Sequence, residues 1–375
     1  MRVVHMIRSF GIAGAEQHLL RLLPGLAERG LDVRLALLEE PRYPMDVYCS
    51  LMAERGIPVD RIPYRGHVNP PAFFQIVRYL RRIRPDLLHT HLIHADVFGQ
   101  LAGRLAGVPL AVSSRHGANE FLRSLLIPRL ARAVTSSAQR VICISDGVAQ
   151  FVREVDRFKP DRVRVIHYGI ETPVSTLTRE EARAALGIDH QGPLAGAFGR
   201  LIPVKGHDVL LDAFARAVAR HPDARLVIVG DGPLRDDLQA QAERLGVGGS
   251  VYFAGWIDNA HRLMPACDLV VIPSRSEGFG LVTLEAMGCS LPVIATRVMA
   301  LPEIVVDGET GLLVPPDDPA ALAAALDSLL GDPARAAAYG QAGYRRLLSS
   351  FTVEKMVDAT AALYNEIIGA AAEVS

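Results

Sequence analysis

Two glutamates, Glu277 and Glu285, stand eight residues apart on either side of a glycine-containing turn. An ionised carboxylate only accepts hydrogen bonds, so it suits the hydroxyl groups of a sugar or a ribose. Eight helical residues span roughly 12 Å. The turn Gly278–Gly280 leads into an expected helix, whose free amides attract an anion. The pair could therefore hold both hydroxyl-bearing ends of a nucleotide diphosphate-sugar; a solvated glutamate and a helix-capping glutamate are the plainer alternative.

Two cations, Arg200 and Lys205, lie between Gly199 and Gly206. Cleavage of a sugar–phosphate bond leaves negative charge on the diphosphate, and fixed cations stabilise that charge. Arginine brings a forked donor and lysine a compact charge. Only three of the 40 basic residues are lysines, so Lys205 in a glycine-flanked loop differs from ordinary surface charge. We expect both cations to contact a diphosphate.

The sequence around these residues resembles the family 4 retaining glycosyltransferases. The resemblance rests on SEGFGLVTLEAMGCSLPVIAT at residues 276–296 and on Gly199-Arg200, four residues, Lys205-Gly206. It covers essentially the whole chain and implies an α/β fold of the GT-B type, in which two Rossmann-like domains with parallel sheets face each other across a cleft. The resemblance implies four catalytic residues: His116, Arg200, Lys205 and Glu277. It also implies that the donor is bound by Arg200, Lys205, Glu277, Gly278, Phe279, Gly280, Leu281, Val282 and Glu285.

Three further stretches are assigned to the donor or acceptor pocket. Gly14 lies in a strand–turn–helix unit that could cradle phosphate; the unit resembles the GGAE turn of the family, with Ala13 in place of the first glycine. Gly230 follows an expected strand and is expected to line the nucleotide pocket. By the same resemblance, Trp256 and Ile257 flank the base, while a tryptophan that only fills the core is the alternative.

Histidines follow two expected strands of the first half. By resemblance, His116 lies against the donor sugar near the transferring carbon; an ordinary strand-end histidine is the alternative. His89 and His91 share one side of a strand, and with His94 and Asp96 they raise the alternative of a metal site. No Asp-x-Asp motif occurs that would hold a nucleotide-bound cation. We therefore expect neither a metal nor another cofactor.

Apolar strands alternate with amphipathic helices along the whole chain, as in α/β domains with parallel sheets. We expect an N-terminal Rossmann-like acceptor-binding domain over residues 1–175 and a C-terminal Rossmann-like donor-binding domain over residues 176–355. A C-terminal helix over residues 356–375 is expected to cross back to the first domain. Gly288 is expected to cap the helix Leu281–Met287.

Charge and composition limit the partners. A net charge of −1 over 375 residues argues against a nucleic-acid binder. Residues 1–175 hold 24 basic and 16 acidic side chains, whereas residues 176–375 hold 16 and 25. The basic half could face an anionic membrane or a phosphate-bearing acceptor; helices that only pack and solvate are the alternative. The arginines expected at a membrane-facing surface are Arg78, Arg81, Arg82, Arg84, Arg123, Arg129 and Arg132.

The expected compartment is the cytoplasm, with contact at the inner face of the membrane. Four scattered cysteines suit a reducing compartment, and we expect no signal peptide and no membrane span. We predict a retaining hexosyltransferase that moves a sugar from a UDP-sugar to a lipid-linked or polysaccharide-precursor hydroxyl. A nucleotide-sugar 2-epimerase, a nicotinamide dehydrogenase and a non-catalytic sugar-nucleotide-binding protein are the alternatives.

Overall fold

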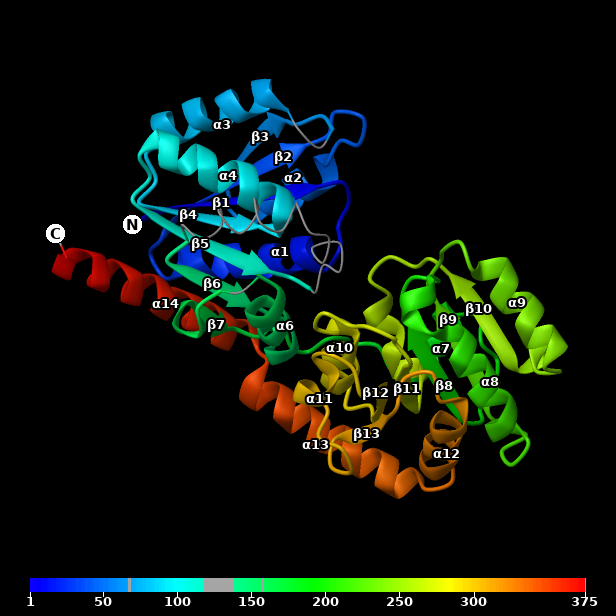
Figure 1. Cartoon of the computed structure of the whole chain (residues 1–375). Coiled ribbons are helices and arrows are strands. Elements are labelled where there is room, and N and C mark those ends of the chain that lie inside the picture. Colours follow the sequence, from blue (N-terminus) through cyan, green and yellow to red (C-terminus); the bar gives the residue numbers. More distant parts are fainter. Residues whose placement is uncertain (67–68, 118–137, 157, 375) are drawn as a thin grey trace. The chain divides into compact units, whose positions relative to one another are not determined.

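The computed structural model describes residues 1–66, 69–117, 138–156 and 158–374. They form two compact units: unit 1 comprises Met1–Gly169 with Val353–Ser375, and unit 2 comprises Ile170–Thr352 (Figure 1). The chain enters and leaves unit 2 at one place, because Ile170 forms a bridge with Thr352 and its N–H donates to the carbonyl of Phe351 at 3.0 Å. The sequence had placed these boundaries near residues 175 and 355.

Unit 1 is built on a seven-stranded sheet in the order β3-β2-β1-β4-β5-β6-β7. Every neighbouring pair of strands is parallel. The first strand lies in the middle of the sheet, and seven of its eight residues are buried. The strands are β1 (Arg2–Ser9), β2 (Asp32–Glu39), β3 (Val59–Pro63), β4 (Leu87–His91), β5 (Leu110–Arg115), β6 (Arg140–Cys143) and β7 (Val163–Val165).

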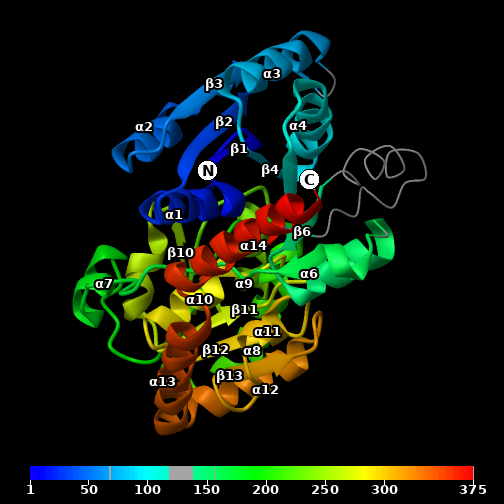
Figure 2. The same ribbon diagram turned by 90° about the vertical axis from the view of Figure 1, so that its left-hand side faces the viewer.

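Helices cover both faces of this sheet. Alternate residues of β1 point to opposite faces: Val4 and Met6 pack with α3 and α4, whereas His5 meets Tyr364 of α14. On that second face α14 packs on α1, with Val357 against Gly25 (Figures 1 and 2). The helices of unit 1 are α1 (Gly14–Glu28), α2 (Asp46–Glu54), α3 (Pro70–Ile83), α4 (Leu92–Ala106), α6 (Asp146–Phe151) and α14 (Val353–Val374).

Unit 2 repeats the arrangement with six parallel strands in the order β10-β9-β8-β11-β12-β13. A single apolar cluster joins its strands to α8, α9 and α12. The strands are β8 (Leu194–Phe198), β9 (Arg225–Val229), β10 (Val251–Gly255), β11 (Leu269–Ile272), β12 (Val293–Thr296) and β13 (Gly311–Val314). The helices are α7 (Arg179–Ala185), α8 (His207–Val218), α9 (Arg235–Arg244), α10 (Leu281–Gly288), α11 (Leu301–Ile304), α12 (Pro319–Leu330) and α13 (Pro333–Ser350).

Both sheets have a topological switch point, where the strand order reverses direction. It lies between β1 and β4 in unit 1 and between β8 and β11 in unit 2. Ligands of open parallel sheets bind beyond the carboxyl ends of the strands at this point. In unit 2 the two segments that follow β8 and β11 are Gly199–Gly206 and Pro273–Gly280, which carry the predicted cations and Glu277.

One predicted helix end differs from the structure, and one predicted helix lies outside the described residues. Gly288 is the last residue of α10 rather than its cap, which is Cys289. A glycine is required there for packing, since a Cβ on Gly288 would lie 2.2 Å from Cγ2 of Val174. The sequence also predicts a helix within residues 120–136, which would carry Arg123, Arg129 and Arg132; this segment lies outside the described residues. No helix in the described ranges combines the length and apolarity needed to span a bilayer.

Candidate functional site

The structure brings Lys205 and Glu277 together at the switch point of unit 2. Lys205 Nζ lies 2.5 Å from Glu277 Oε2, and both side chains are largely buried, with 23% and 16% exposed. Ser274 Oγ also donates to Glu277 Oε2, at 3.4 Å. A positive and a negative group are therefore held side by side at the carboxyl edge of the sheet, the edge at which open parallel sheets bind ligands.

Arg275 fixes the loop that carries Lys205 against the turn that carries Glu277. Its guanidinium donates to the carbonyl of Pro203 at 2.5 Å and to both carboxylate oxygens of Asp208 at 2.9 and 2.7 Å. It also reaches Asp317 at 2.7 Å. Burial would raise the pKa of Asp208, but the hydrogen bonds and charge of Arg275 outweigh it and hold this pKa below its usual range. Arg275 thus acts as a clamp between the loop that carries Lys205 and the turn that carries Glu277.

Helix α10 begins directly after this turn. Gly280 is its N-cap residue with a φ of +91°, and within the described part of the chain no side chain caps this end of the helix. The amides of a helix start favour an anion. Of the predicted donor residues, Gly278, Leu281, Val282 and Glu285 are half-buried here and Phe279 is buried.

The remaining donor residues of unit 2 follow the neighbouring strands. Arg200 is exposed at the end of β8, and none of the described residues forms an ion pair with it. Gly230 follows β9, and its N–H donates to the carbonyl of Gly255 at 2.8 Å. After β10, Trp256 is 64% exposed and its indole N–H donates to Asp258 at 3.1 Å, while Ile257 is half-buried. The exposure of Trp256 argues against a role as core filler.

Gly14 and His116 belong to unit 1 instead. Gly14 starts α1 and is exposed, and the carboxylate of Glu16 accepts the N–H of Ala13 at 3.0 Å just before the helix. His116 is half-buried, and both of its ring nitrogens are engaged. Nε2 lies 3.0 Å from Nδ1 of His91, and Nδ1 is bonded to the hydroxyl of Tyr168. Burial, with a smaller effect of Arg115, lowers the pKa of His116 to about 3, so the ring is neutral near pH 7.

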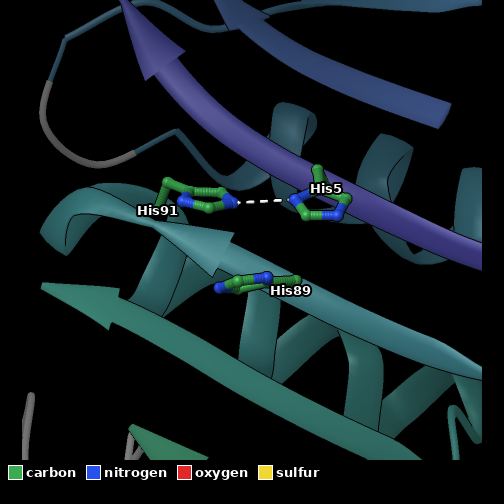
Figure 3. A group of neighbouring side chains, drawn as sticks. All are labelled: His5, His89 and His91. Carbon is green, nitrogen blue, oxygen red and sulfur yellow. Dashed lines mark hydrogen bonds between the residues drawn. The ribbon is translucent and has the colours of Figure 1, made fainter. Parts of the chain in front are cut away.

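His89, His91, His94 and Asp96, which the sequence raises as an alternative metal site, do not come together as one group. Asp96 pairs with the guanidinium of Arg115 and accepts from Thr90 and Ser113 at 2.5 and 2.8 Å. Thr90 points to the face opposite His89 and His91, because side chains alternate along a strand. The two histidines instead meet His5 of β1 (Figure 3), and ring nitrogens of these three residues lie within 4.8 Å of one another.

Sequence reasoning missed four residues that build these sites. Arg275 stands inside the predicted turn, and its charge next to Glu277 was a usable signal. His5 and Tyr364 carried no local signal, because their partners come from distant strands and from the last helix. Tyr168 follows β7 and binds His116.

Comparisons with known proteins agree with this architecture. A family model described as "Glycosyl transferases group 1" matches residues 178–346, and one described as "Glycosyltransferase Family 4" matches residues 12–173. A D-inositol 3-phosphate glycosyltransferase of Acidothermus cellulolyticus is 35% identical over 360 residues, which cover 86% of this chain and 79% of the relative. An alpha-maltose-1-phosphate synthase of Mycolicibacterium smegmatis is 30% identical over 312 residues, covering 75% and 79%.

A likeness to solved structures extends over nearly the whole chain. HepE of Anabaena, solved in complex with UDP, matches with a TM-score of 0.86 at 24% identity and covers 98% of this chain and 100% of its own. This likeness concerns the fold.

Proposed function

Because the chain belongs to the family 4 glycosyltransferases, an enzyme family of the GT-B fold, we propose that it transfers a hexose from a UDP-sugar to an acceptor hydroxyl with retention of the anomeric configuration. The observation that carries the proposal is the Lys205–Glu277 pair beside the uncapped start of α10. UDP as the nucleotide is supported by HepE, whose structures are described with UDP and with UDP-glucose.

The four charged residues predicted in unit 2 each have a role that their positions allow. Glu277 keeps Oε1 for a sugar hydroxyl, since the hydrogen bonds with Lys205 and Ser274 use Oε2. Lys205 and Arg200 stabilise the diphosphate together with the amides at the start of α10. Glu285 takes the ribose hydroxyls. With this positive charge supplied by the chain, we propose that the reaction needs neither a metal nor another cofactor.

The proposed reaction proceeds on one face of the sugar. The bond between the anomeric carbon and the diphosphate breaks, and the acceptor oxygen bonds to that carbon from the same side. The proton of the acceptor hydroxyl passes to the departing phosphate oxygen. His116 contacts the sugar beside the reacting carbon, as a neutral imidazole.

The acceptor is a hydroxyl compound that carries a phosphate or a lipid-linked phosphate. The relatives are named for D-inositol 3-phosphate and for alpha-maltose-1-phosphate, and the sequence itself predicts a lipid-linked or polysaccharide-precursor acceptor. The arginines Arg78, Arg81 and Arg82 are exposed on α3 together with Phe74, which is 68% exposed. This basic and apolar helix face suits contact with an anionic membrane, which flotation with anionic and neutral liposomes tests.

A donor and product assay tests the proposal. Thermal unfolding with UDP, GDP and ADP should show the largest stabilisation with UDP. Incubation with UDP-glucose and either a phosphorylated polyol or a lipid-linked acceptor should release UDP and give a product with the α configuration of the donor, measured by proton NMR, with EDTA present throughout. A β-linked product would contradict retention, and conversion of the donor without acceptor would indicate an epimerase. Loss of activity in EDTA would contradict metal independence.

A further inference from the structure

A continuous hydrogen-bonded chain of side chains runs through unit 1 behind His116. Its links are Tyr168 to His116, His116 to His91 at 3.0 Å, His91 to His5 at 2.9 Å, His5 to Tyr364 at 3.3 Å, Tyr364 to His89 at 2.5 Å and His89 to Ser114 at 2.7 Å. Each histidine uses one ring nitrogen for each of its two neighbours. Apart from the half-buried His116, all members are buried.

The ring geometry shows that these are end-to-end imidazole hydrogen bonds. The rings of His5 and His91 are nearly parallel, at 14°, and their centres lie 5.2 Å apart while the facing nitrogens are 2.9 Å apart. Two stacked rings would have closer centres, so the nitrogens face each other along the ring planes (Figure 3). His91 and His116 repeat this spacing, with centres 5.2 Å apart.

Only two proton arrangements let the Tyr364 hydroxyl also donate its own proton within this hydrogen-bonded chain. A neutral imidazole has one N–H donor and one bare acceptor nitrogen. If Tyr168 donates to Nδ1 of His116, every ring must carry its proton on Nε2, down to the bond that His89 donates to Ser114. If Ser114 donates to His89, every ring must carry its proton on Nδ1. The four histidines therefore share one tautomer.

The same bonds argue against a metal at His5, His89 and His91. All six of their ring nitrogens already have a partner among the described residues. A metal ion would have to displace several of these bonds, because it needs the bare electron pair of each nitrogen that binds it. Apolar side chains of similar shape could fill the same space with little or no loss of stability, since the net contribution of a buried hydrogen bond is small. A functional role therefore explains these hydrogen-bonded side chains better than a contribution to stability does.

We propose that Tyr364, His5 and His91 are positioning residues that set the tautomer and ring orientation of His116 through this chain. Removal of the Tyr364 hydroxyl in α14 would then change the tautomer of His116, although His5 and His91 lie between these two residues. The consequence for catalysis rests on the proposed role of His116 at the donor sugar; the tautomer coupling does not.

The test is a Tyr364→Phe variant of the full chain with ¹⁵N-labelled histidine. In the wild-type protein we expect the ¹⁵N shifts of His5, His89, His91 and His116 to report one shared tautomer. The variant should give a mixed or switched tautomer at His116. The control is Tyr79→Phe, which removes another buried hydroxyl of unit 1, bonded to Asp60 at 2.8 Å; it should leave His116 unchanged. If the Tyr364→Phe variant does not fold, Ser114→Ala interrupts the chain at its far end.

The outcomes separate this inference from the proposed function. The proposed tautomer coupling would be refuted by an unchanged His116 tautomer in a folded Tyr364→Phe or Ser114→Ala variant. Mixed histidine tautomers in the wild-type protein would also refute it. So would a bound metal found by elemental analysis whose removal shifts the histidine signals. If the tautomer changes, we expect kcat to fall about tenfold, by analogy with the hydrogen-bond partners that orient metal-binding histidines, with little change in KM. If the tautomer of His116 changes and kcat does not, the tautomer coupling stands and His116 is not part of the proposed site.

Discussion

The ion pair of Lys205 and Glu277 couples two residues that the proposed reaction uses for different tasks. Both side chains are mostly shielded from water, and their charged atoms are 2.5 Å apart. Removing one partner leaves the other charge in a half-buried position without its counter-charge. Substitutions at the two positions should therefore be non-additive, as is usual for residues in contact.

Lys205→Ala should lower kcat by about 10²- to 10³-fold, as the loss of one charge stabiliser at a reacting centre does. Lys205→Arg should recover part of the activity because it restores the charge with a different shape. Lys355→Ala, which removes an exposed lysine of α14, is the control. Steady-state UDP release measures all three. Wild-type turnover in Lys205→Ala would remove this residue from the mechanism.

Whether a site residue could be predicted depended on whether the sequence immediately around it shows a recognisable pattern. Lys205 and Glu277 were identified because each lies in a short glycine-containing turn with a recognisable spacing, and the structure brings them into contact. The charge of Arg275 beside Glu277 was visible, but its partners Asp208 and Asp317, 67 and 42 residues away, could not be predicted because no pattern around them points to Arg275. The link between His5 and Tyr364 spans 359 residues and depends on strand order and on the last helix.

At the scale of the elements, the turn between β8 and α8 depends on Gly206. This glycine has a φ of +67°, and a Cβ on it would lie 2.1 Å from the carbonyl oxygen of Pro273. Pro273 begins the segment that carries Glu277. The close approach of the two backbones is therefore part of what places Lys205 beside Glu277.

Gly206→Ala should destabilise unit 2 by more than Gly187→Ala. Gly187 has the same backbone conformation, with a φ of +68°, but nothing lies within 4 Å of its added Cβ. Gly187→Ala should thus show only the left-handed penalty of about 1–2 kcal/mol, while Gly206→Ala adds the backbone clash and also lowers activity. Urea unfolding of both variants measures the difference. Equal losses of stability would show that the contact with Pro273 is readily relieved.

The alternation of strands and helices was largely predictable because parallel strands buried on both faces are short apolar runs between amphipathic helices. The sequence pattern predicts a strand over Arg2–Ser9 and a helix over Pro319–Leu330, and β1 and α12 have these bounds. The strand β3 was missed because Val59–Pro63 is a mixed, partly exposed edge strand. Gly288 was misassigned because a glycine at a helix end has two explanations, a left-handed cap or close packing, and only coordinates distinguish them.

For the whole molecule, buried histidines are concentrated in unit 1. Burial lowers the pKa of both His5 and His116 to about 3. It also lowers the pKa of His18, His89 and His91 well below the usual value, with smaller effects of the neighbouring histidines. In unit 2, burial is the main cause that lowers the pKa of His207 to about 4.

This asymmetry predicts that acid unfolds unit 1 before unit 2. An unfolded histidine binds a proton near pH 6.5, whereas the folded rings stay neutral to far lower pH, so falling pH favours the unfolded state. The stability of unit 1 should be complete above pH 6.5 and decrease as the pH falls through 6.5 toward the folded pKa values. Each buried histidine contributes up to about 1.4 kcal/mol per pH unit. Carboxylates, with ordinary pKa values near about 4, remain mostly ionised down to pH 5.

Differential scanning calorimetry at pH 7.5 and pH 5 measures this effect. At pH 5 we expect an early transition that UDP does not shift, followed by one that UDP raises, because the proposed nucleotide site lies in unit 2. A His18→Phe variant, which removes one buried imidazole stacked on Tyr168 at 4.3 Å between ring centres, should weaken the pH dependence of the early transition alone. If the early transition were the one that UDP raises, the histidines of unit 1 would not be what limits stability in acid.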